Sequence, residues 1–198
     1  MHSRMHPYLN WAKERLDEMD AVLASLEVRV GEVQADARLR ASETLADLRE
    51  KRNIFQDTVS KQAGAGEAAW ISAKAKLDSE WTAFEAQVKQ YVENFAQQAE
   101  QQRATFERQS NAQLKAWHAV AERLDRDTRE FATERRSEVE AAVKRMTVEA
   151  AAAEEKLRKF SQAGTRSWAA MTAALTETRA AFDRANQATA DAFKRAVR

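Results

Sequence analysis

Few side chains of this sequence could support catalysis or hold a metal. Histidine occurs three times, as His2, His6 and His118, and cysteine is absent. His2 and His6 are four residues apart and could share a metal on a helix, but they precede Pro7 at the end of the chain, so we expect no native metal site. His118 lies in a helical stretch, where an exposed histidine is more common than an acid–base catalyst. No nucleophile has a base beside it, so we predict no enzyme, no catalytic residues and no cofactor.

The charges of the chain also point away from a reaction. Carboxylates alternate with Lys and Arg at helical spacing, which is typical of a solvated helix face. Gly64-Ala65-Gly66 lacks the further glycine and the strand context of a phosphate loop. With 32 basic and 31 acidic residues, the formal net charge is only +1. Because nucleic-acid binders concentrate cations on one face, we expect no nucleic-acid partner.

The composition favours narrow apolar stripes along helices. Hydrophobic residues make up 44 % of the chain, the mean hydropathy is −0.68, and there are one Pro and four Gly, too few for the turns of a β-rich fold. No run approaches the ~20 apolar residues of a membrane-spanning helix. The first residues lack the apolar core of a secretory signal, so a cytoplasmic location is the default expectation.

An eleven-residue apolar repeat runs from Trp70 to Trp117. One position of the repeat holds Trp70, Trp81, Val92 and Leu114, with Arg103 as the exception, and the position three residues later holds Ala73, Phe84, Phe95, Phe106 and Trp117. Eleven residues complete three turns at about 3.67 residues per turn, close to a straight α-helix. The repeat therefore predicts one long helix with a partner, and similar spacing continues in the last helix.

The first helix has a different period. Its apolar residues alternate spacings of three and four, as in a left-handed heptad coiled coil. They are Leu9, Ala12, Leu16, Met19, Leu23, Leu26, Val30, Val33 and Ala37. Gly31 lies one residue off this seam, and an inserted spacing of four follows Ala37, but the periodicity continues through both. We therefore expect one helix that changes its twist before it ends.

Two glycine-containing segments divide the chain into helices of about 7–62, 66–162 and 166–198. Glu67 is expected to open the second helix, and Thr165 or Ser167 to cap the third. The helices after the two breaks also match at a fixed offset, which suggests a weak internal repeat or shared packing constraints. Trp70, Leu77, Phe84, Glu85 and Phe95 align with Trp168, Leu175, Phe182, Asp183 and Phe193.

The helix lengths predict where the chain ends lie. Short glycine turns make successive helices antiparallel neighbours, so helices one and three should fold back along the long central helix. Counting back from the turns places Pro7 beside about residue 121 and Arg198 near about residue 130. Both ends then meet over the window 122–138, which is crowded with charges and poor in apolar residues. We interpret this window as a solvated helix, with a binding patch as the alternative.

The predicted fold is all-α: a single elongated antiparallel helical hairpin or coiled coil over 1–198, with a very long central helix. A pair of helices leaves one side of every large aromatic side chain exposed to solvent, so we expect a homodimer with a four-helix cross-section. The predicted core and oligomer-interface residues are Leu16, Leu23, Leu26, Trp70, Trp81, Phe84, Phe95, Phe106, Trp117, Trp168, Phe182 and Phe193.

Two functions remain open on these grounds. The first is a non-enzymatic structural, scaffold or assembly protein that acts through coiled-coil packing, with itself or with an unidentified protein. The alternative is an amphipathic-helix protein that associates with a lipid or other hydrophobic surface.

Overall fold

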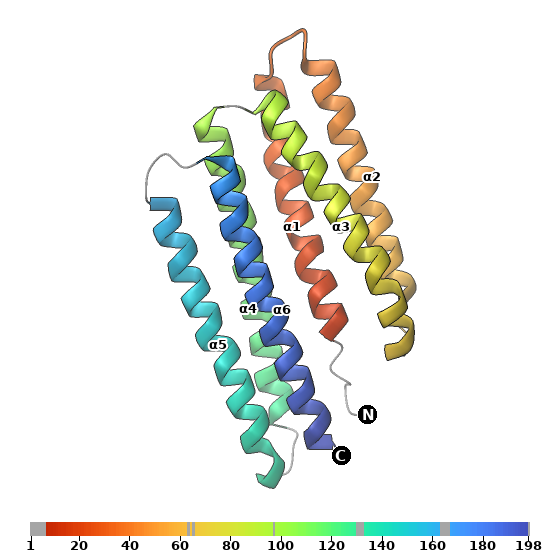
Figure 1. Cartoon of the computed structure of the whole chain (residues 1–198), viewed down its shortest axis with the longest axis vertical. Coiled ribbons are helices and arrows are strands. Elements are labelled where there is room, and N and C mark those ends of the chain that lie inside the picture. Colours follow the sequence, from red (N-terminus) through yellow and green to blue (C-terminus); the bar gives the residue numbers. More distant parts are fainter. Residues whose placement is uncertain are drawn as a thin grey trace. The chain divides into compact units, whose positions relative to one another are not determined.

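The computed structural model of the chain describes residues 7–62, 64, 66–96, 98–129, 133–162 and 167–197. These residues form helices joined by short connections, and no strand occurs among them, so the all-α prediction is confirmed. The elements are α1 (Pro7–Arg29), the 3₁₀ turn η1 (Val30–Glu32), α2 (Arg38–Gln62), α3 (Glu67–Phe95), α4 (Ala99–Thr128), α5 (Thr133–Gln162) and α6 (Trp168–Val197) (Figure 1).

The number of helices differs from the prediction of three. The stretch 7–62 divides into α1 and α2, and the stretch 66–162 divides into α3, α4 and α5, so the described part of the chain holds six α-helices. The glycine-containing breaks lie where they were expected. Helix α3 begins at Glu67, and Ser167 caps α6 by accepting the N–H of Ala170 on Oγ at 3.3 Å. Thr165 lies outside the described residues.

The break between α1 and α2 falls at Gly31, where the sequence pattern had suggested a continuous helix. Val33 is extended, with φ −67° and ψ 142°. Arg38 then binds two carbonyls of the connection between the helices, because its Nη2 donates to Gly31 O at 3.0 Å and to Val33 O at 3.2 Å. The cost of glycine in a helix, together with this cap, explains why the helix stops here.

The other two breaks carry no glycine or proline in the described residues. Helix α3 ends at Phe95; the next residue, Ala96, has φ −128° and ψ 51°, and Gln102 Nε2 donates to its carbonyl at 3.2 Å. Helix α4 ends at Thr128, inside the charged window, and Arg136 Nη2 donates to Arg129 O at 2.6 Å. In both places a side chain from the next helix satisfies a carbonyl beyond the end of the previous one.

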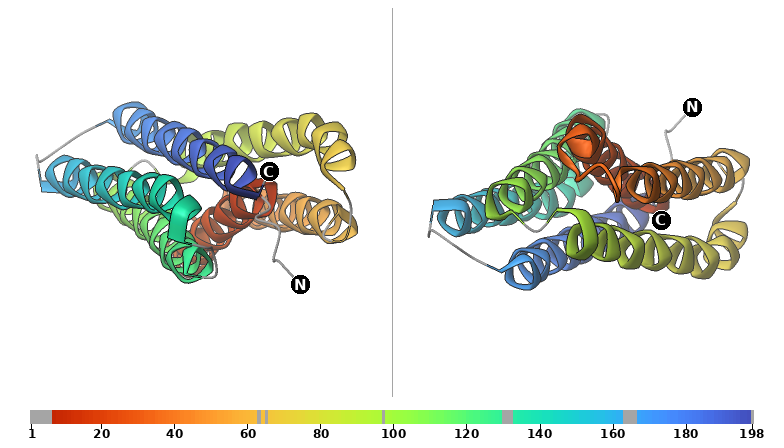
Figure 2. Two further views of the ribbon diagram at one scale, coloured as in Figure 1. Left: turned by 90° about the horizontal axis from the view of Figure 1, so that it is seen from below. Right: turned by 90° about the horizontal axis from the view of Figure 1, so that it is seen from above.

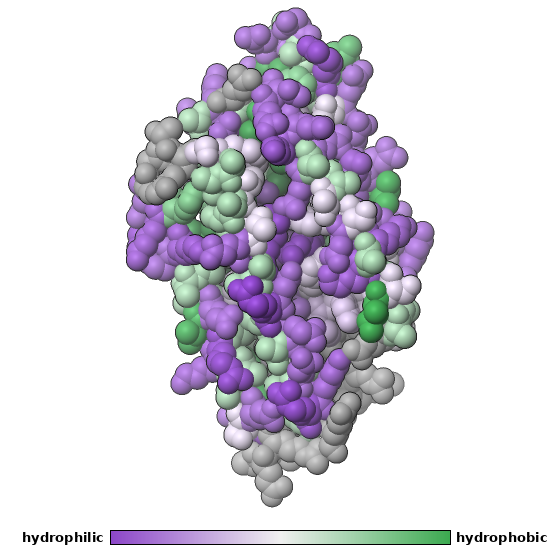
Figure 3. Space-filling view, viewed as in Figure 1, coloured by the Kyte–Doolittle hydropathy of each residue, from purple (hydrophilic) through white to green (hydrophobic). Residues whose placement is uncertain are grey.

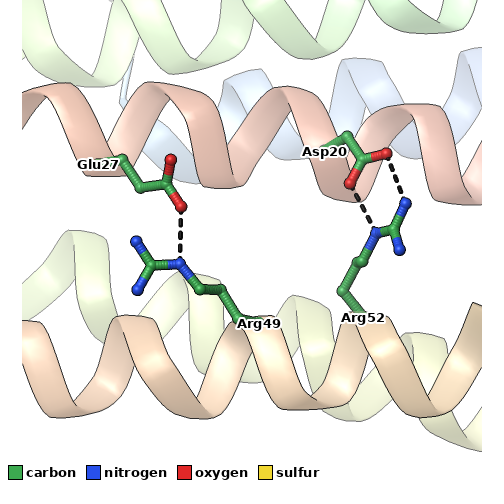
Figure 4. A network of polar contacts seen from close by, with 4 residues as sticks. All are labelled: Asp20, Glu27, Arg49 and Arg52. Carbon is green, nitrogen blue, oxygen red and sulfur yellow. Dashed lines mark hydrogen bonds and ion pairs between the residues drawn. The ribbon is translucent and has the colours of Figure 1, made fainter.

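The chain forms two compact units, Arg15–Gln109 and Met1–Glu14 with Ser110–Arg198. In the 15–109 unit, two ion pairs join α1 to α2 (Figure 4). Arg52 binds Asp20 through two bonds of 2.7 and 2.9 Å, and Arg49 binds Glu27 at 2.7 Å. The later residue of α1, Glu27, pairs with the earlier residue of α2, Arg49, so the two helices are antiparallel. The bidentate contact with Asp20 raises the pKa of Arg52 above its ordinary value.

The rest of the 15–109 unit continues this alternation. Helix α3 returns antiparallel to α2, to which it lies close in every view (Figures 1 and 2). The first part of α4 runs antiparallel to α1, since Thr105 contacts Ser25 and Gln101, earlier in α4, contacts Glu32. The unit is therefore an up-down-up-down packing of four helical segments.

In the 110–198 unit, α5 and α6 form the closest pair (Figure 2). Lys156 of α5 pairs with Glu177 of α6, and Glu138 of α5 pairs with Arg195 of α6. The second pair lies 18 residues earlier in α5 and 18 residues later in α6 than the first. This constant register defines an antiparallel hairpin. Both helices carry buried alanines: Ala142, Ala150 and Ala153 on α5, and Ala174, Ala185 and Ala192 on α6. Helix α4 runs parallel to α6, because Gln113 contacts Leu175 and Trp117 contacts Phe182.

Two contacts lie near the charged window, where the counting places the chain ends, although Arg198 and residue 130 are outside the described residues. Arg123 of α4 contacts Asn10 of α1, and Arg195 of α6 binds Glu138 of α5 at 2.6 Å. The window is not a continuous helix, however. It contains the end of α4 and the start of α5, and this break explains its lack of apolar residues.

The described surface is mainly polar. The face in Figure 3 is dominated by hydrophilic residues, with hydrophobic ones scattered among them. The large hydrophobic side chains that are exposed are Val28, Leu39, Ile54, Ile71 and Val148. No described helix combines the length and apolar character needed to cross a membrane.

The seam residues of α3 give a matched test of the packing. Phe84 is 1 % exposed, whereas Phe95 is half-buried. We expect Phe84→Ala to lower the free energy of unfolding by about 3–5 kcal/mol, and Phe95→Ala by clearly less. Urea denaturation of both variants measures the difference. Equal losses would contradict the packing of this helix.

Candidate functional site: the buried helical core

The aromatic and leucine residues of the seams are the candidate functional residues, and most of them are buried. In the 15–109 unit the buried ones are Leu23, Leu26, Trp70, Trp81, Phe84 and Phe106; Leu16 and Phe95 are half-buried. In the 110–198 unit Trp117, Trp168, Phe182 and Phe193 are buried. Burial within one chain is a property of this structure, while a role at an oligomer interface stays a prediction.

Ring contacts link helices that are distant in sequence. Trp117 of α4 meets Phe182 of α6 edge to face, with centroids 5.5 Å apart and an angle of 73° between the rings. Arg15 of α1 lies 5.4 Å from the centroid of the Trp81 ring of α3, and it is only 5 % exposed. A buried guanidinium over a Trp face forms a favourable cation–π contact. These contacts join helices through shape and charge as well as apolar area.

A series of hydrogen-bonded polar side chains lies inside the 110–198 unit. Arg123 donates to Asn10 Oδ1, Asn10 Nδ2 donates to Asn186 Oδ1 at 2.9 Å, and Asn186 Nδ2 donates to Pro7 O at 2.7 Å. Both amide orientations are fixed by their partners, because Arg123 can only donate and the Pro7 carbonyl can only accept. These hydrogen bonds hold the first turns of α1 against α4 and α6.

A second polar contact lies inside the 15–109 unit. Ser25 and Thr105 are 1 % exposed, and their hydroxyl oxygens are 2.9 Å apart. Thr105 uses its proton on Gln101 O at 3.0 Å, so Ser25 is the donor between the two. This contact helps to fix the position of α4 along α1, since a shift of either helix by one turn would remove the acceptor of the Ser25 hydroxyl.

Some buried polar atoms have no hydrogen-bond partner within the described residues. They include Tyr91 Oη, Gln113 Oε1 and Trp117 Nε1. Each such atom loses its hydration without replacement, which costs about 1–3 kcal/mol. For Tyr91, burial raises the pKa of the phenol above its ordinary value of 10.0. The core is therefore less stable than an apolar core of the same size would be.

The polar core residues were missed by the sequence analysis. Asn10, Ser25, Thr105 and Asn186 lie off the expected seams, and nothing in their local sequence distinguishes them from exposed polar residues. Trp11, Val22 and Tyr91 were also missed, although their size and apolar character could have indicated that α1 and α3 bury more than one narrow stripe.

The described surface offers little for catalysis. His118 and Glu154 are 3.5 Å apart and both exposed. No group of three or more metal-ligand side chains occurs in the described ranges, and His2 and His6 lie outside them. Near the end of α5, hydrogen bonds from Arg158 and Lys159 lower the pKa of Glu155 below its ordinary value. These are features of solvated helix faces.

Comparisons with known proteins do not extend this account. No protein-family model matches the chain, and neither the curated proteins nor the solved structures give a significant match. A functional proposal therefore depends on the residues and contacts described above.

The asparagine pair can be tested by one substitution. Asn186→Ala leaves the buried Asn10 amide without its acceptor and removes a bond to the Pro7 carbonyl, so we expect a loss of about 1–3 kcal/mol of stability. Hydrogen exchange should rise in the first turns of α1. Asn53→Ala, at an exposed position of α2, is the control and should leave both readouts unchanged. A stable Asn186→Ala variant with a protected α1 would contradict the role of this pair.

Tyr91 predicts a pH dependence. Below its ordinary pKa of 10.0 the phenol is neutral in both states, but above it the unfolded chain ionises while the folded chain retains its proton. Stability should therefore fall as the pH rises above about 10, through the raised pKa of the folded state. Tyr91→Phe should remove part of this fall and should not destabilise the protein at neutral pH.

The matched control for that experiment is Tyr8→Phe, at the other tyrosine of the chain. Denaturant unfolding between pH 7 and 11 measures the effect. An unchanged alkaline loss in Tyr91→Phe, or a large loss of stability at neutral pH, would contradict the assignment.

Proposed function

We propose that this protein is a non-enzymatic structural or assembly protein that acts through coiled-coil helix packing. The observation that supports this most is the burial of the largest side chains. All five tryptophans are at most 7 % exposed: Trp11, Trp70, Trp81, Trp117 and Trp168. They serve to close helices on one another. The surface then presents charged residues and ion pairs, as expected for a spacer or scaffold.

A homodimer belongs to this proposal as a separate prediction. It was based on the expectation that two helices leave aromatic side chains exposed. Since Trp70, Phe84 and Trp117 are each at most 1 % exposed in a single chain, that argument no longer supports it. What remains is the scattered exposed residues, such as Leu39 and Val148, which could contact another protein.

The alternative function, association with a hydrophobic surface, is favoured by the unsatisfied polar atoms of the core. Tyr91 Oη, Gln113 Oε1 and Trp117 Nε1 would regain hydration if the helices opened. Opening would also expose the amphipathic faces that bind at lipid interfaces. The exposed apolar residues of the closed state are too scattered to bind such a surface, so this function requires opening.

Two measurements on the intact chain separate these functions. We expect light scattering at micromolar concentration to give a defined mass of 22.4 kDa or a small multiple of it, and phosphatidylcholine vesicles to leave the protein in the supernatant. Co-sedimentation with the vesicles, accompanied by exposure of tryptophan, would overturn the scaffold proposal and support the alternative.

A further inference from the structure

The helices of this chain recur with a period of 98 residues, far beyond the five residue pairs visible in the sequence. When the end of α1, Arg29, is shifted by 98 residues, it falls one residue before the end of α4, Thr128. The bounds of α5 and α6 all lie within four residues of those of α2 and α3 shifted by 98. Only the start of α4, at Ala99, falls clearly earlier than the shifted start of α1. The order of elements is therefore α1, α2, α3 and then the same three again.

The buried positions follow the same period in all three helix pairs. In α1 and α4 they are Met19 and Trp117, Val22 and Val120, and Leu26 and Leu124. In α2 and α5 they are Ala41 and Val139, Leu45 and Val143, and Leu48 and Met146. In α3 and α6 they are Trp70 and Trp168, Leu77 and Leu175, and Phe84 and Phe182. The closest helix pairs also correspond, since α2 packs on α3 as α5 packs on α6.

One hydrogen bond recurs at equivalent positions and does not follow from amphipathic periodicity. Arg38 Nη2 donates to the carbonyl of Gly31, and Arg136 Nη2 donates to the carbonyl of Arg129. Both members of the second pair lie 98 residues after those of the first. In each case an arginine near the start of the second helix satisfies a carbonyl just past the end of the first. Helix packing alone does not require this contact at a helix break.

The two compact units do not coincide with the two repeats. Residues 7–14, the start of α1, belong to the unit of α5 and α6, where Asn10 contacts Asn186 and Arg123. Residues 99–109, the start of α4, belong to the unit of α2 and α3, where Thr105 contacts Ser25. Ser25 and Arg123 are equivalent positions in the two repeats. The exchange is therefore reciprocal, as in an isologous contact between two copies.

We infer that the chain is an internal pseudo-dimer: two fused three-helix repeats, α1–α3 and α4–α6, each of which accepts the N-terminal turns of the other's first helix. The partner that completes each repeat is the other repeat of the same chain. This arrangement supplies within one molecule the contacts that a dimer of a single repeat would supply between two.

Cleavage between the repeats in the full-length protein tests this. A specific protease site is inserted after Ala96, between α3 and α4, and the folded protein is cut. We expect the two halves to remain together at the mass of the intact chain, 22.4 kDa, and to part only in denaturant. The same protein left uncut is the control. Halves that separate under native conditions, whether folded or not, would overturn the inference.

A second experiment does not depend on the inserted site. The chain has no cysteine, so Ser25→Cys with Thr105→Cys introduces the only two thiols, where the native hydroxyl oxygens are 2.9 Å apart. Oxidation should join them within one chain. The control pair combines Thr105→Cys with Ser42→Cys, an exposed position of α2, and should stay reduced. Free thiols in the Ser25 pair, or a disulfide that links two chains, would overturn the assignment.

Discussion

The structure depends on one constraint: large aromatic side chains on an amphipathic helix need more than one neighbouring helix to cover them. A Trp or Phe buries about 150–250 Å², more than a single partner helix can enclose. The chain meets this need by breaking its helices at 30–37, near Ala96 and after Thr128. Each of these breaks reverses the chain, so that α2 returns along α1, where Arg52 binds Asp20, and α4 and α6 meet through Trp117 and Phe182.

Apolar burial alone would not fix how these helices slide along one another, because Leu and Ala stripes pack in several registers. The polar contacts supply that information. The bond between Asn10 and Asn186 and the bond that Ser25 donates to Thr105 are made in this register and would be lost by a shift of one turn. A buried polar side chain is best attested in this role when it specifies an alignment at some cost in stability.

The sequence predicted the helical class, the glycine turns and the start of α1 at Pro7, and ten of the twelve predicted core residues are buried, because apolar periodicity reports burial directly. It did not predict three of the breaks, although each lies near an anomaly in the pattern. These anomalies are Gly31, Arg103 and the charged window 122–138. A continuous period on both sides of each anomaly was interpreted as a continuous helix. Polar core residues could not be predicted, since their burial follows from long-range packing.

In each of the two units, tryptophan side chains are buried by helices of the same chain. The most direct test is tryptophan fluorescence with acrylamide quenching over a wide range of protein concentration, because all five tryptophans are at most 7 % exposed. For tryptophans buried within one chain, we expect blue-shifted emission and weak quenching that do not change on dilution. Strong quenching, or quenching that rises as the protein is diluted, would contradict this burial.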